Sequence, residues 1–511
     1  MTEPDRDGER TAVAGAHPTS VDDAGLARRV ARNTAGPLAA SVIERGLGLL
    51  LASYAAKVLG PLGVGAYAVA QNVWLFASIL ADFGLGTLLT REVARDRPAA
   101  AELTASTVGL RLALATACAP AAVLVATIYG DRAILITVGL LAAGFFPTAI
   151  AGALSAVFAG YERMTTPAAV QLVTGVLTAG LGFAVLSLGW GIVGLGAVSL
   201  AVSALTAAAF LWLVRRTYFA PRVALVPRDL RAQLREAWPL MLNALLNTIF
   251  FRSDIQVLEA LRGRRAVGHY GIAFRIVDAV GILPSRFVLA LFPALSQRSA
   301  AGDASFLVVY RLAVKLLLGL AAPIAIGITV LAHDLTLLIS DARYLPDSAV
   351  ALQILVWYVP GSFWNGLTQY VLIAVGQQRW ITLGFFLATT FNVAANLLLV
   401  PRYGLVAAAW TTVASEVVLF VPFAVTVRRS LGTLPLWREA LVPLIGGLAS
   451  AAVALGLSRL DSPSLAVAFA ALLVYAVAWL ALRPLDREEW ELLAGLWRRS
   501  GTRSEPDAAA G

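Results

Sequence analysis

Long apolar stretches separated by short polar connections make up most of this chain. Each stretch is about as long as the roughly 20 residues that an α-helix needs to cross a hydrocarbon core of about 30 Å. These stretches occupy residues 35–58, 64–88, 104–128, 132–158, 167–188, 191–213, 238–260, 267–295, 311–332, 349–375, 380–400, 404–427, 440–458 and 464–482. The pattern predicts an all-α polytopic membrane protein with about 14 transmembrane helices.

The composition agrees with this class. Hydrophobic residues make up 59% of the chain and charged residues 14%, and the mean hydropathy is +0.77, unlike an ordinary soluble domain. The net charge of +9 suggests nucleic-acid binding at first sight. Most arginines, however, lie in the connections, where they meet anionic lipid head groups. We therefore expect membrane lipids and no nucleic acid as partners. Cys118 has no second cysteine to pair with, which excludes an internal disulfide and a cysteine-rich metal site.

The connections differ in their arginine content. With the N-terminus inside, the cytoplasmic connections hold clusters of arginines and the opposite ones hold mostly single arginines, although Arg262, Arg264 and Arg265 break the pattern. The clustered residues are Arg91, Arg95, Arg97, Arg215, Arg216, Arg222, Arg228, Arg231, Arg235, Arg428, Arg429 and Arg438. This bias predicts a multi-pass protein of the cytoplasmic membrane with both termini in the cytoplasm.

Two parts of the chain resemble each other. Residues 64–70 (VGAYAVA) align with 267–273 (VGHYGIA), and 191–194 (GIVG) align with 404–407 (GLVA). Helices 1–6 and 7–12 are therefore expected to be two parallel six-helix repeats, with helices 13 and 14 as a C-terminal pair. Chance similarity between apolar segments is the alternative.

These features predict six parts. They are a disordered cytoplasmic tail with a short basic helix, a six-helix bundle, a cytoplasmic linker, a second six-helix bundle, helices 13–14, and a cytoplasmic amphipathic helix with a tail. In that order they occupy residues 1–34, 35–213, 214–236, 237–427, 428–482 and 483–511.

Charged residues interrupt several of the spans. An ionisable side chain in the middle of a span costs about 2.5–3.5 kcal/mol on insertion scales, so it needs a cavity or a partner. Helices 1, 7 and 8 carry such residues, namely Glu44, Arg45, Arg252, Asp254, Arg275 and Asp278. Asn243, Asn247 and Asp254 share one face of helix 7, and Gln71, Ser78 and Asp82 share one face of helix 2. The repeat places helices 1, 2, 7 and 8 at equivalent positions, so we expect their polar faces to line one central cavity.

Several motifs resemble those of a known family. Residues 57–67 (KVLGPLGVGAY), 82–86 (DFGLG) and 91–96 (REVARD) resemble the start of polysaccharide-type and O-antigen-type flippases. These belong to the multidrug/oligosaccharidyl-lipid/polysaccharide exporter superfamily. Residues 283–286 (LPSR) and 292–296 (FPALS) resemble its eighth helix. The resemblance implies a V-shaped flippase that moves a polyprenyl-diphosphate-linked oligosaccharide from the inner to the outer leaflet for cell-surface polysaccharide biosynthesis.

This ligand suggests roles for the buried polar residues. A lipid diphosphate carries about two negative charges, and arginine binds phosphate oxygens bidentately. We expect Arg45, Arg252 and Arg275 to bind the diphosphate, with Glu44, Asp254 and Asp278 orienting them. The residues expected to contact sugars are Asn243, Asn247, Gln369, Asn392 and Asn396. The alternative is that these groups form ion pairs and hydrogen bonds that hold helices together.

A few other residues have alternatives of their own. Glu416 in helix 12 is a candidate for ion coupling, or a carboxylate at a cavity rim. Arg311 and Lys315 lie near the end of helix 9, where we expect their side chains to snorkel to the interface. His269, near the outer end of helix 8, is expected at the solvated surface, with a proton switch as the alternative. Trp190, Trp238, Trp380 and Trp437 lie at span edges and are typical of the interfacial belt.

Enzyme motifs are missing from the sequence. It contains no G-x-x-x-x-G-K-[ST] loop, no H-E-x-x-H pair and no G-x-S-x-G motif. We expect a transporter rather than an enzyme, without cofactor or metal, acting as a monomer by alternating access. Glycan polymerases or glycosyltransferases are expected as neighbours by analogy.

Several alternatives remain. They are a multidrug or cation antiporter of the same superfamily, a flippase for the peptidoglycan precursor, a membrane glycosyltransferase or polymerase acting on polyprenyl-linked glycans, and a fourteen-helix major facilitator. Helices 13 and 14 and the buried arginines favour an anionic, lipid-linked substrate.

Overall fold

The computed structural model describes residues 21–224, 227–281, 305–432, 436–460, 462–482 and 489. The tail before residue 21, the motifs at 283–286 and 292–296 and most of the expected amphipathic end lie outside these residues. Within the described chain every regular element is a helix. The α-helices are α1 (Val21–Asp82), α2 (Leu85–Arg95), α3 (Ala100–Thr127), α4 (Arg132–Ala143), α5 (Phe145–Gly160), α6 (Thr165–Ser187), α7 (Gly191–Thr217), α8 (Pro227–Val280), α10 (Ser305–Ile339), α11 (Asp347–Leu355), α12 (Tyr358–Ala374), α13 (Gln378–Leu431), α14 (Leu436–Ser458) and α15 (Ser464–Ala481), and η1 (Ala342–Tyr344) is a short 3₁₀ helix.

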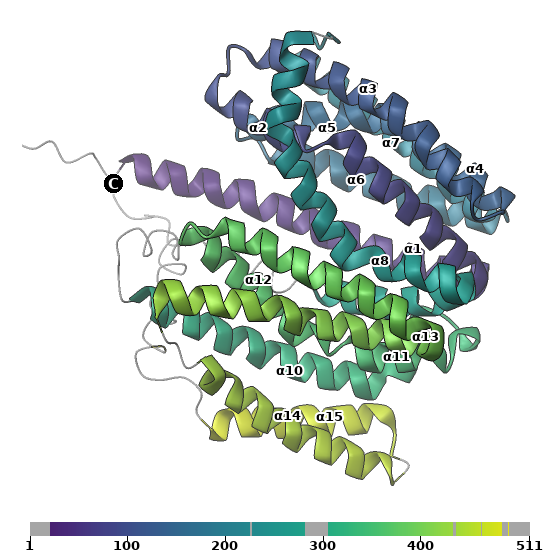
Figure 1. Ribbon diagram of the computed structural model, residues 1–511, viewed down its shortest axis with the longest axis vertical. Helices are drawn as coiled ribbons and strands as arrows, with labels where there is room; N and C mark the ends of the chain where they lie inside the picture. The colour runs from purple at the N-terminus through teal and green to yellow at the C-terminus, as the bar shows by residue number, and fades with distance from the viewer. Residues whose placement is uncertain are drawn as a thin grey trace, which may run out of the picture.

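Three of these helices fold back on themselves and form two spans each. Gly60 in α1, Gly263 in α8 and Gly404 in α13 have φ values of 65°, 77° and 58°. Glycine adopts this left-handed region without steric cost, so the chain can reverse within one residue. We call the end of the molecule that holds these three turns the glycine end (Figure 1).

The remaining helices complete the fourteen predicted spans. Two spans are each divided between two helices, α4 with α5 and α11 with α12, and α3, α6, α7, α10, α14 and α15 form one each. Of the described chain, nine helical segments are long and apolar enough to cross a bilayer, and the two longest, Ala40–Arg95 and Gln378–Leu431, allow two crossings each. The prediction of an all-α protein with about 14 spans is confirmed.

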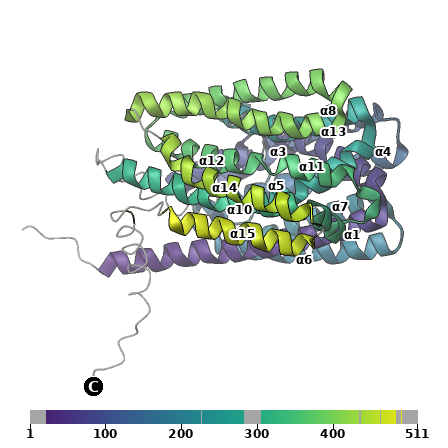
Figure 2. The ribbon, with the colours of Figure 1, turned by 90° about the horizontal axis from the view of Figure 1, so that it is seen from below.

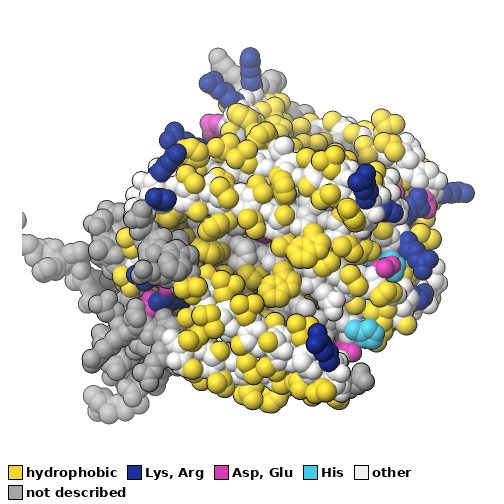
Figure 3. Space-filling model, turned by 60° about the horizontal axis from the view of Figure 1, so that its bottom comes forward, with side chains coloured by type: hydrophobic (Ala, Val, Ile, Leu, Met, Phe, Trp, Pro, Cys, Tyr) yellow, Lys and Arg dark blue, Asp and Glu magenta, His cyan; other side chains and the backbone are white. Residues whose placement is uncertain are grey.

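The outer surface suits a lipid environment. Large apolar side chains face outward, such as Leu398 at 75% and Leu465 at 74% exposure, which is unfavourable in water. In Figure 3 the basic side chains gather mostly toward the two ends of the helices, and apolar side chains cover much of the middle. This distribution supports the membrane assignment.

The helices form two bundles with α1 and α8 between them (Figure 1). Helices α2 to α7 belong to the first bundle and α10 to α13 to the second, while α14 and α15 pack on α10 at the outer edge of the second bundle. The view from below shows the long helices running side by side (Figure 2). The α1 helix begins at Val21 and runs on into the first span, and residues 214–217 and 227–236 of the expected linker at 214–236 are helical.

Equivalent contacts in the two bundles confirm the parallel repeat. The Tyr67 hydroxyl group lies close to Ser199 in the first bundle. In the second bundle the Tyr270 hydroxyl group lies 3.2 Å from Thr412 Oγ1. Both tyrosines belong to the repeated segment, so each copy of the unit ties its second helix to its sixth in the same way.

The two bundles are in close contact at the glycine end. A Cβ atom added to Gly65 would lie 1.9 Å from the carbonyl oxygen of Arg264, and one added to Gly268 would lie 1.9 Å from that of Pro61. These two glycines occupy equivalent positions of the repeat. Arg264 also forms an ion pair with Asp131, which connects α8 to the start of α4. The backbones of the two halves therefore touch at this end.

A second set of contacts closes the same end. Arg343 Nη2 donates to the carbonyl oxygen of Lys57 at 2.5 Å and to Asp341 Oδ2 at 2.6 Å. Its guanidinium group, by hydrogen-bonding the carboxylate, holds the pKa of Asp341 below its usual range. The connection between α10 and α11 is therefore fixed to the first hairpin.

Candidate functional site

A cavity of about 500 Å³ lies between the two bundles, bounded by α1 and α8. Its lining residues come from both arms of each helix, before and after the turns at Gly60 and Gly263. These arms are spans 1, 2, 7 and 8, so the four expected helices do line one shared cavity. Its size falls within the range of small-molecule binding sites, about 300–1,000 Å³.

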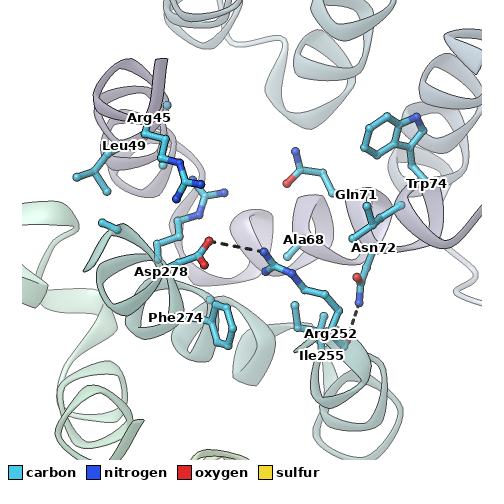
Figure 4. Close-up of a pocket in the computed structure, with 16 residues that line it drawn as sticks. Arg45, Leu49, Ala68, Gln71, Asn72, Trp74, Arg252, Ile255, Phe274 and Asp278 are labelled. Atoms are coloured by element: carbon cyan, nitrogen blue, oxygen red, sulfur yellow. Dashed lines mark hydrogen bonds and ion pairs between the residues drawn. The ribbon is translucent and has the colours of Figure 1, made fainter. Parts of the chain in front are cut away.

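Among the described residues, three arginines and one carboxylate give the cavity its charge. Arg45, Arg252, Arg275 and Asp278 all line it. Arg252 Nη2 lies 3.7 Å from Asp278 Oδ2, and its guanidinium carbon lies 5.0 Å from the centre of the Phe274 ring. Figure 4 shows the Arg252 side chain extended across the cavity toward Asp278.

The other two arginines are less constrained. Within the described residues, Arg45 and Arg275 lie within 4 Å of no carboxylate oxygen. Two guanidinium groups are thus available to an anion, while the third already has a counter-ion. Such a site can hold a ligand with about two negative charges.

Two acidic residues expected to orient the arginines lie elsewhere. Asp254 is 3% exposed and accepts hydrogen bonds from the Tyr270 hydroxyl group at 2.5 Å and from the backbone N–H of Ile255 at 2.8 Å. The side chain of Glu44 approaches α6, where a Cβ atom on Gly175 would lie 3.2 Å from Glu44 Cγ. Neither lines the cavity, so Asp278 rather than Asp254 is the partner of Arg252.

The asparagines expected to contact sugars also lie outside the cavity. Asn243 is exposed and Asn247 lines a second cavity in the C-terminal bundle. Asn392 and Asn396 are buried, where Asn392 Nδ2 donates to Ser415 Oγ at 2.9 Å and Asn396 Nδ2 to the Asn392 carbonyl oxygen at 2.9 Å. Asn392, which also accepts a hydrogen bond from Ser253 of α8, therefore connects helices as the structural alternative held, whereas Asn396 bonds within its own helical arm.

The opposite wall of the central cavity holds Gln71, as expected from the polar stripe of helix 2, together with two residues that the sequence did not single out, Asn72 and Trp74. Gln71, Asn72 and Trp74 follow one another on the second arm of α1 and line the cavity. Asn72 Nδ2 donates to the carbonyl oxygen of Arg252 at 3.1 Å, which joins α1 to α8 across the cavity. The signal for the two missed residues in the sequence is a tryptophan in the middle of a span, beside the polar stripe that contains Gln71.

The second cavity has a volume of about 200 Å³ and contains Glu416. Asn365 Nδ2 donates to Glu416 Oε2 at 2.7 Å and to the Glu416 carbonyl oxygen at 2.8 Å. Glu416 is 3% exposed, with no basic residue within ion-pair distance among the described residues. Gln369 and Asn247 lie on the wall of the same cavity.

Arg311, Lys315 and His269 differ from expectation. Lys315 is 6% exposed and its Nζ atom lies 2.8 Å from Glu489 Oε1 and 3.2 Å from Glu439 Oε2. Arg311 Nη2 lies 2.7 Å from Glu439 Oε1. The expected snorkelling is therefore wrong, because carboxylates from α14 and the C-terminal segment approach these cations. The expectation of a surface histidine is also wrong, since His269 is 3% exposed.

Comparison with known proteins gives two family matches. Residues 30–299 match the family described as polysaccharide biosynthesis protein, and residues 239–398 match the family described as MatE. No curated protein shows significant sequence similarity to the chain.

Solved structures share the fold. The lipid II flippase MurJ in an inward closed conformation superposes with a TM-score of 0.70 at 14% identity, over 87% of this chain and 98% of that one. An inward-facing multidrug resistance MATE family transporter of the MOP superfamily gives 0.63 at 19% identity, over 76% and 94%. A MOP superfamily transporter from Pyrococcus furiosus gives 0.57 at 16% identity, over 79% and 96%.

Proposed function

Because its match covers residues 30–299, more than half of the chain, the protein belongs to the polysaccharide biosynthesis protein family, and we propose that it is a flippase for a polyprenyl-diphosphate-linked oligosaccharide. The observation that carries this proposal is the excess of arginine in the cavity between the two bundles. The ligand moves from the inner to the outer leaflet of the cytoplasmic membrane.

The charges of the cavity match this ligand. Arg45 and Arg275 bind the diphosphate oxygens, because guanidinium groups remain protonated and can donate two parallel hydrogen bonds. Arg252 joins them when its contact with Asp278 is exchanged for the ligand. A cationic drug would meet net repulsion here, since three arginines face one carboxylate.

The contacts at the glycine end support alternating access. We place this end outside and both termini in the cytoplasm, in agreement with the arginine bias of the connections. The pairs Gly65–Arg264 and Gly268–Pro61 keep the outer end closed. Separation of the two bundles at this end would release the head group outward while the polyprenyl tail stays in lipid.

The driving force need not involve a nucleotide. An inside-negative membrane potential assists outward movement of an anion by about 2.3 kcal/mol per charge per 100 mV if the charge crosses the whole field. Glu416 is the candidate for an added coupling to a cation or proton gradient, since it is buried beside an amide and, among the described residues, forms no ion pair with a base.

Glu416 and the MatE match also favour a second candidate function, a cation-coupled multidrug antiporter. In that case the transport of cationic dyes would depend on a proton or sodium gradient and would fall in a Glu416→Gln variant. The arginine cavity would then have no role in binding the substrate.

Leaflet exchange in proteoliposomes tests the proposal. Wild-type protein should exchange a fluorescent undecaprenyl-diphosphate oligosaccharide, and Arg45→Ala and Arg275→Ala should each slow exchange by at least about tenfold, because a hydrogen bond to a charged group contributes about 1.5–3 kcal/mol. Arg132→Ala serves as the matched control, since Arg132 is exposed at the glycine end and lies outside the cavity. Export of cationic dyes without lipid exchange would instead support the antiporter.

A further inference from the structure

The central cavity has two chemically different walls. Its cationic wall carries Arg45 on the first arm of α1 and Arg275 on the second arm of α8. Gln71 and Trp74 line it from the second arm of α1, and Figure 4 shows them across the pocket from Arg45. A purely anionic ligand would contact only the cationic wall, and a neutral sugar would contact only the wall formed by Gln71 and Trp74.

Trp74 is not an interfacial tryptophan. It lies in the middle of a span, whereas Trp190 lies at a span edge and is 60% exposed. One side of Trp74 packs on the core that α3 and α4 form, and the residue also lines the cavity. Its indole ring is therefore held by packing while part of it faces the ligand space.

The amide groups beside Trp74 are positioned as well. The Gln71 side chain lies close to the Tyr67 hydroxyl group, which Ser199 also approaches. A glutamine side chain offers one oxygen acceptor and two N–H donors, so this contact leaves capacity for a ligand. Asn72 is 3% exposed and donates to the Arg252 carbonyl oxygen, so its role is to join the walls.

An aromatic ring beside an amide with spare hydrogen-bonding capacity suits a sugar. A pyranose has apolar C–H groups on its ring faces, which pack on an indole, and hydroxyl groups at its rim, which pair with amides. Building on the proposed flippase function, we propose that Trp74 and Gln71 form a subsite for the first sugar of the glycan, next to the diphosphate on the arginines. The walls thus fix the direction in which the head group lies.

The size of the cavity limits how many sugars of the glycan this site can contact. A volume of about 500 Å³ accommodates a diphosphate and a small number of sugar rings, not a long chain. Specificity therefore rests on the sugar at the reducing end, and the remaining glycan extends out of the cavity.

Binding measurements on the full-length protein in lipid nanodiscs test this subsite. The probes are undecaprenyl diphosphate and the same lipid carrying one hexose or one N-acetylhexosamine. Wild-type protein should bind a glycosylated probe more tightly. Trp74→Ala should remove this gain, a loss of up to about tenfold, and leave binding of the bare lipid unchanged, while Arg275→Ala should weaken binding of every probe.

Two further variants separate recognition from folding. Trp74→Phe keeps an aromatic face and should retain part of the sugar-dependent gain even if Trp74→Ala is poorly folded. Trp190→Ala, at an exposed span edge, should change neither affinity.

The outcomes distinguish this subsite from the proposed function. If wild-type protein binds the bare and glycosylated lipids equally, or if both Trp74 variants weaken all probes alike, the sugar subsite is refuted and the flippase proposal stands. If wild-type protein binds none of the probes, both proposals fail.

Discussion

The residues of the cavity balance binding against release. Three free arginines would hold a diphosphate strongly, which would slow its departure. Asp278, 3.7 Å from Arg252 and about half exposed, moderates this field without neutralising it. An exposed pair of this kind is weak, about 0–1 kcal/mol, so a ligand phosphate can displace the carboxylate.

Replacement of Asp278 by asparagine tests this balance. Because the substitution removes one negative charge from the cavity, we expect Asp278→Asn to bind undecaprenyl diphosphate a few-fold more tightly, about fivefold at most, and to exchange it more slowly. Nanodisc binding and leaflet exchange measure the two effects. Asp334→Asn, on an exposed residue outside the cavity, is the control. Weaker binding would show that Asp278 supports the site instead of moderating it.

At the scale of the helices, an ion cluster attaches the C-terminal pair to the rest. Lys315 on α10 contacts Glu439 on α14 and Glu489 near the C-terminus, and all three side chains are at most 8% exposed. One helical turn further along the same face of α10 the junction is apolar, and a Cβ atom on Gly319 would lie 2.2 Å from the Trp479 ring. Charge and close packing thus fix α14 and α15 against α10.

Removal of Lys315 should therefore destabilise this junction. Breaking a buried ion pair from one side costs about 3–5 kcal/mol, so Lys315→Ala should lower the midpoint of thermal unfolding clearly. Arg311→Ala is the matched control, since its side chain is 37% exposed and Glu439 keeps Lys315 as a partner. Equal midpoints for the two variants would contradict a structural role of the buried cluster.

The sequence predicts the positions of the helices better than it predicts which groups their polar residues contact. Apolar length alone locates the fourteen spans, and the equivalent tyrosines Tyr67 and Tyr270 reveal the repeat. Helical spacing shows that Asn247 and Asp254 share a face, but it does not show that this face turns toward the second bundle and away from the cavity. The partners of Lys315 are similarly hidden, because Glu439 and Glu489 are distant in sequence and meet it only through packing.

At the scale of the whole molecule, the two bundles can open outward only if the contacts at the closed glycine end are broken. Arg264 and Arg343 tie loops of one bundle to the other, but their contacts are near the surface and are individually weak. The backbone approach at Gly65 and Gly268 is different, because it requires that no side chain be present at either position. Closure thus depends on Gly65 and Gly268. Each of these glycines packs against the helical hairpin of the other half.

An added methyl group at this contact should keep the two bundles apart at the outer end. In Gly65→Ala the new Cβ atom would lie 1.9 Å from the Arg264 carbonyl oxygen, far inside van der Waals contact distance. The two bundles must therefore separate by about 1 Å or more to accept it. We expect the distance between spin labels at Arg132→Cys and Tyr403→Cys, in a Cys118→Ser background, to increase. Lipid exchange should slow, because a protein held open toward the outside cannot return to the inward-facing state to bind another lipid.

Gly139→Ala, where the added methyl group meets no atom within 4 Å, is the control. An unchanged distance in Gly65→Ala would mean that the hairpins yield locally and that this contact does not hold the two bundles together.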